Sequence, residues 1–80
     1  MPTVFRIDGY RFFFWSNENT KPPHVHVEKG GGHAKFWLKD GKLVSSSGFK
    51  PADLRRIRAI LIENMDTISE QWNAYFGQSN

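Results

Sequence analysis

The chain has 80 residues, contains no cysteine and carries a net charge of +3. This length suits one small domain over residues 1–80, and the lack of cysteine excludes disulfides, thiolate zinc sites, iron–sulfur clusters and cysteine nucleophiles. The apolar runs are too short to cross a membrane and no signal peptide precedes the first strand-like segment, so we expect a cytoplasmic protein.

The first half of the chain is expected to form about five antiparallel strands. Asp8-Gly9, Gly30-Gly31 and Asp40-Gly41 are dipeptides typical of two-residue type I′ turns, and each separates segments rich in β-branched and aromatic residues. We therefore expect strands near residues 3–8, 10–16, 24–29, 32–39 and 42–46, in one sheet over residues 3–46.

These turns also predict which side chains share a face of the sheet, because successive residues of a strand point to opposite faces. The predicted core face holds Phe5, Ile7, Phe12, Phe14, Val25, Val27, Ala34, Phe36 and Leu38. The other face, expected to be open, holds Arg6, Arg11, Phe13, Trp15, His24, His26, Glu28, His33, Lys35, Trp37 and Lys39. In this register His26 lies opposite Lys35, and Arg6 lies opposite Arg11.

The last third of the chain predicts one long amphipathic helix over residues 51–76. Pro51 suits the first helical position, apolar residues then recur every third or fourth position, and Gly77 is a stop signal. Asn64 tolerates a helix end, so a break would fall there. The expected fold is therefore α+β: an antiparallel β-meander of about five strands packed against one long C-terminal helix.

Histidines at alternate positions of a predicted strand suggest chemistry on a phosphodiester. His24 and His26 project from one face and would exchange protons near neutral pH, and Lys35 would stabilise the developing charge. On the same face Arg6 and Arg11 would bind phosphates, while Trp15 and Trp37 would stack on bases. These parts suffice for a metal-independent ribonuclease that uses no cofactor.

Two other interpretations of the same histidines stay open. His24, His26 and Glu28 are acceptable metal ligands, although three alternate positions of one flat strand do not surround an ion well. Alternatively, the histidines are ordinary surface or half-buried aromatic residues, and the face binds a partner protein or nucleic acid without catalysis.

Several segments together resemble a known family of small bacterial proteins. These segments are Met1 to Arg6, Gly9 to Phe14, Ser16 to Glu18, Pro22 to Val27, Ala34 to Leu38, Leu54 to Ile57 and Trp72 to Phe76. They resemble Domain of Unknown Function 4160, which has no settled activity. Its members are typically encoded beside a second small protein, an arrangement that resembles a toxin–antitoxin pair. The expected fold is also loosely similar to HicA-type RNA-cleaving toxins.

We therefore expect the toxin-like component of a bacterial toxin–antitoxin-type pair that acts on RNA through its basic, histidine-containing sheet face. The resemblance implies a small antitoxin-like protein as the cognate partner. The alternative is a non-catalytic protein-interaction or nucleic-acid-binding module. The sequence leaves the oligomeric state open.

Overall fold

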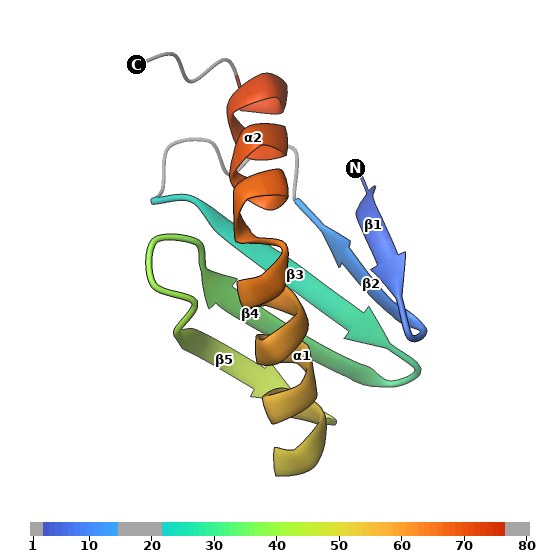
Figure 1. Cartoon of the computed structure of the whole chain (residues 1–80). Coiled ribbons are helices and arrows are strands. Elements are labelled where there is room, and N and C mark those ends of the chain that lie inside the picture. Colours follow the sequence, from blue (N-terminus) through green and yellow to red (C-terminus); the bar gives the residue numbers. More distant parts are fainter. Residues whose placement is uncertain (1–2, 15–21, 77–80) are drawn as a thin grey trace.

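Five strands and two helices form the part of the chain that the computed structural model describes, residues 3–14 and 22–76. The strands are β1 (Thr3–Ile7), β2 (Tyr10–Phe13), β3 (His24–Lys29), β4 (Gly32–Trp37) and β5 (Leu43–Ser47). They form one antiparallel sheet in the order β1-β2-β3-β4-β5, and the helices α1 (Pro51–Glu63) and α2 (Met65–Phe76) lie across one face (Figure 1). The predicted α+β class is confirmed.

The first two hairpins have the predicted registers. Phe5 pairs with Phe12 and Arg6 with Arg11 in the first hairpin, and His26 pairs with Lys35 in the hairpin of β3 and β4. Asp8 and Gly9 both have positive φ, at 54° and 84°, as a type I′ turn requires. In the second hairpin only Gly30 has positive φ, which fits a type II′ turn, so the type I′ prediction is wrong there.

The connection between β4 and β5 is longer than the predicted two-residue turn. β4 ends at Trp37 and β5 begins at Leu43, so the strands predicted over 32–39 and 42–46 are shorter or shifted. Asp40 accepts a hydrogen bond from the backbone N–H of Lys42 at 3.0 Å, which closes a local turn. Arg58 Nε of α1 donates to the carbonyl oxygen of Gly41 at 3.0 Å and holds this loop against the helix.

The core lies between the sheet and the two helices. Alternate residues of the inner strands supply its sheet side, and Ile57, Ile60, Leu61, Ile68 and Trp72 supply its helix side. The sheet side consists of Tyr10, Phe12, Phe14, Val25, Val27, Ala34, Phe36 and Leu38. The predicted core face is confirmed, although Phe5 and Ile7 of the edge strand are only partly buried.

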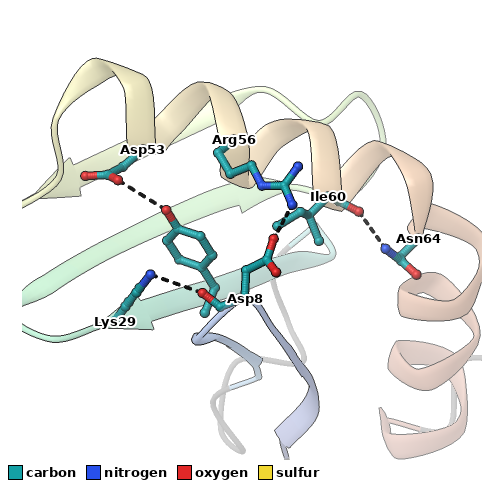
Figure 2. A network of polar contacts seen from close by, with 7 residues as sticks. Asp8, Lys29, Asp53, Arg56, Ile60 and Asn64 are labelled. Carbon is teal, nitrogen blue, oxygen red and sulfur yellow. Dashed lines mark hydrogen bonds and ion pairs between the residues drawn. The ribbon is translucent and has the colours of Figure 1, made fainter.

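The predicted single helix is two helices that break at Asn64, and the prediction of one long helix over 51–76 is corrected accordingly. The Asn64 side-chain amide donates to the carbonyl oxygen of Ile60 at 2.8 Å, next to the bond from its own backbone N–H (Figure 2). Such a side chain competes for helical carbonyls and favours a local end. Neither α1 nor α2, the helices of the described residues, has the length and apolar character needed to cross a membrane.

Polar contacts tie the first hairpin to α1 (Figure 2). Arg56 forms an ion pair with Asp8 of the turn, and Lys29 Nζ donates to the Asp8 carbonyl oxygen at 3.1 Å. The Tyr10 hydroxyl donates to Asp53 in the first turn of α1 at 3.2 Å. Asp53 also accepts a hydrogen bond from the backbone N–H of Lys50, the residue that precedes α1. This N–H has no partner within the helix, and the Asp53 carboxylate supplies one. The helix is thereby fixed in one orientation over the sheet.

Candidate nucleic-acid interface

The sheet face opposite the helices, called the outer face below, carries most of the residues predicted to act on RNA. The registers place Arg6 opposite Arg11, His24 opposite Trp37, and His26 between Phe13 and Lys35. Because these are paired positions, the side chains share one face. Trp15, the other predicted base-stacking residue, lies outside the described residues. The described part of the predicted site is thus brought together.

The outer face is closed, not open, around the two predicted catalytic histidines. His24 is 1% exposed and His26 is 4% exposed, so the expectation that their imidazoles are accessible is wrong. Phe13 is also buried and stacks on His26 with ring centres 5.4 Å apart. His24 contacts Trp37 of β4 and Trp72 of α2, with ring centres 6.1 and 5.7 Å away, so at the start of β3 its ring also meets the helix layer. Period-two alternation predicts the face of a residue but not its aromatic neighbours.

His26 has a partner that the sequence analysis does not predict. Its Nδ1 lies 3.1 Å from Nε2 of His33, which is only half-buried. His33 pairs with Glu28 and is therefore the diagonal neighbour of His26 across β3 and β4. Diagonal neighbours in antiparallel strands are within reach of long side chains. The predicted register of β3 and β4 was therefore sufficient to predict that His26 and His33 lie close together.

The predicted phosphate-binding arginines differ in their surroundings. Nη1 of Arg11 lies 2.7 Å from Oε2 of Glu28, and its guanidinium lies 4.2 Å from the centre of the Phe13 ring. Glu28 thus offsets the repulsion expected from placing Arg11 opposite Arg6. Arg6 is exposed and Lys35 is half-buried. Arg6 is therefore the most exposed of these three predicted cations, and Arg11 is already engaged by Glu28.

A pocket of about 400 Å³ opens beside Trp37. Its lining consists of Pro22, Pro23, Trp37, Lys39, Asp40 and Lys42. Trp37 is half-buried, so one part of its indole is fixed by the protein while another remains accessible. Asp40 is already engaged by the Lys42 backbone N–H, and the two lysines give the pocket a net positive charge. The pocket therefore offers an aromatic surface next to two cations.

The sequence analysis assigns no site role to Lys39 and Lys42. The sequence feature that could have indicated them is a pair of lysines on either side of Asp40-Gly41, with the first lysine two residues after Trp37. Only the extended loop between β4 and β5 brings both of them to the same pocket as Trp37. Among the described residues, no three histidine, aspartate or glutamate side chains are grouped so that they could hold a metal ion.

Comparison with known protein families gives one match. The family described as a domain of unknown function (DUF4160) matches residues 9–73, which include β2 to β5, all of α1 and most of α2. The chain belongs to this family. No curated protein and no solved structure matches the chain. The family membership therefore implies no particular activity.

Proposed function

We propose that the protein binds single-stranded RNA at the outer face, with Trp37 as the stacking platform. The observation that carries this proposal is the pocket in which the Trp37 indole lies beside Lys39 and Lys42. Proteins that bind single strands combine a cationic groove for the backbone with aromatic side chains on which bases stack. Each stacked base contributes about 1–3 kcal/mol, and the cations add a salt-dependent attraction.

The charge on the rest of the outer face supports this proposal. Arg6 and Lys35 are cations of that face, and Glu28, its acidic residue among the described strands, is engaged by Arg11. A strand leaving the Trp37 pocket would therefore meet positive charge in the direction of β1. An anionic protein surface would meet the same charge, but would have no base to stack on Trp37.

Burial of His24 and His26 favours binding without cleavage. A general acid or base must come within about 2.6–3.2 Å of the atom whose proton it transfers. Side chains that are 1% and 4% exposed do not reach a polymer in this conformation. We therefore propose a nucleic-acid-binding module, which was the alternative to a ribonuclease. Labelled RNA should stay intact with the wild type, whereas cleavage that disappears in the His24→Ala, His26→Ala double variant would support catalysis instead.

Membership of a two-protein, toxin–antitoxin-type module is a further hypothesis that the family resemblance suggests. A small partner protein that covered the outer face would compete with RNA for Trp37. Adding a partner isolated with the natively expressed protein should then release bound RNA. Simultaneous binding of both would place the partner elsewhere.

The binding proposal is tested by the salt dependence of affinity. Fluorescence anisotropy of a labelled oligouridylate would be recorded over a series of salt concentrations for the wild type and for the Lys39→Ala, Lys42→Ala double variant. The slope of log K against log salt should become shallower by about 0.7 for each phosphate contact removed. Arg55→Ala is the matched control, because Arg55 is an exposed cation of α1 that does not line the pocket. Binding that is absent at low salt, or equally weakened by the control, would contradict the proposal.

A further inference from the structure

A second hollow of about 240 Å³ adjoins the Trp37 pocket. Pro23 and Lys39 line both hollows, so the two share a boundary. The remaining lining of the second hollow is Leu38, Ser69, Trp72 and Asn73. The combined groove therefore runs from the loop between β4 and β5, past Lys39, to α2.

The uncharged polar lining of the second hollow comes from one face of α2. Ser69 and Asn73 are four residues apart and Trp72 is three residues after Ser69, which places all three on adjoining positions of one helix face. Asn73 is exposed and its amide offers two donors and an acceptor, while the Ser69 hydroxyl offers both roles. Such groups can form hydrogen bonds with the edge of an unpaired base.

An unused donor lies next to this stripe. The indole Nε1 of Trp72 is buried and has no hydrogen-bond partner among the described residues. Buried polar groups are nearly always paired, so this indole N–H calls for a partner such as an ordered water. The second hollow therefore adjoins a donor whose hydrogen bond the described residues do not supply.

We infer that the two hollows accept two consecutive nucleotides of a single strand. This inference rests on the proposed RNA binding and adds to it the way in which sequence is recognised. The first base stacks on Trp37, Lys39 contacts the phosphate between the two nucleotides, and the second base lies in the hollow of α2. There Ser69 and Asn73 hydrogen-bond to its edge. Stacking tolerates every base, whereas edge contacts distinguish one base from another.

The test compares two variants of α2 and one of β4 on four homopolymeric RNA oligonucleotides. Wild-type affinity should differ among the four, and Asn73→Ala should reduce affinity for the preferred one by about tenfold, as loss of one or two hydrogen bonds implies. Asn73→Ala should thereby remove most of the base preference. Gln71→Ala is the matched control, because Gln71 is an exposed amide of α2 that does not line the hollow.

Trp37→Ala separates failure of this inference from failure of the binding proposal. It should weaken binding to all four oligonucleotides by a similar factor without changing their order. If Trp37→Ala has that effect but Asn73→Ala behaves like Gln71→Ala, the second nucleotide site is wrong and the stacking site stands. If neither variant changes binding, both are wrong. A dinucleotide that binds no better than a mononucleotide would also overturn the two-nucleotide site.

Discussion

Nδ1 of the buried His26 lies within hydrogen-bond distance of Nε2 of His33, at 3.1 Å across the hairpin of β3 and β4. One nitrogen must donate and the other accept. The bond therefore forms only when one of these two nitrogens carries a proton and the other does not. The pair links a buried side chain to a half-exposed one on the outer face.

Removal of this bond should destabilise the fold slightly. His33→Ala is expected to lower the free energy of unfolding by about 1 kcal/mol, the usual net value of one such hydrogen bond. His33→Gln keeps a donor and an acceptor on a side chain of similar reach, so it should retain more of the stability. Urea denaturation measures both. Equal stability of the Ala and Gln variants would show that the bond contributes nothing.

Packing of Phe49 requires glycine at position 32. A Cβ built on Gly32 would lie 2.5 Å from two carbons of the Phe49 ring. Gly32→Ala should therefore cost about 1–3 kcal/mol, the range for forcing extra atoms into a packed site. Gly31→Ala is the matched control in the same turn, because a Cβ there meets nothing within 4 Å. Thermal denaturation compares the two.

A double variant tests whether the Phe49 ring causes the destabilisation expected from Gly32→Ala. In a Phe49→Ala background the cost of Gly32→Ala should largely disappear, because the clashing ring is gone. An unchanged cost in that background would mean that the backbone at Gly32, and not the ring, rejects alanine.

Tyr10 should make stability fall at alkaline pH. Burial, followed by the hydrogen bond to Asp53, raises the pKa of Tyr10 above its ordinary value of 10.0. The folded state therefore holds this proton more tightly than the unfolded state. The contribution is fully present below about pH 10 and is lost as the pH rises through the higher folded pKa.

Tyr10→Phe removes the titrating hydroxyl and tests whether Tyr10 causes the loss of stability at alkaline pH. At neutral pH the variant should lose about 0.5–1.5 kcal/mol, because the hydrogen bond to Asp53 is missing. Above about pH 10 its stability should fall less steeply than that of the wild type. Urea denaturation at several alkaline pH values gives both slopes. Parallel curves would contradict the raised pKa of Tyr10.

The strand pairing was predictable because local chemistry determines it. Asp8 and Gly9 supply two consecutive residues with positive φ, and Gly30 supplies one, so each tight turn fixes the register of its hairpin. The break at Asn64 was harder to predict, since the apolar periodicity continues through it. There a side-chain bond to the Ile60 carbonyl decides the outcome.

The candidate site was only partly predictable. Alternation along β3 correctly placed His26 on the outer face, but it did not report that His24, the first residue of β3, also contacts Trp72 of α2, or which rings bury the two histidines. The Trp37 pocket depends on the loop between β4 and β5, which the contact from Arg58 to the Gly41 carbonyl holds against α1. That contact joins residues far apart in sequence, so no local pattern reports it.

The most direct test of RNA binding at Trp37 follows the indole N–H signals in proton–nitrogen correlation spectra during titration with a short oligouridylate. The chain has three tryptophans, and the spectrum of Trp37→Phe assigns the signal of Trp37. If RNA stacks on Trp37, this signal should move in a saturable way, and high salt should reverse the movement. A Trp37 signal that stays in place throughout the titration would contradict the account.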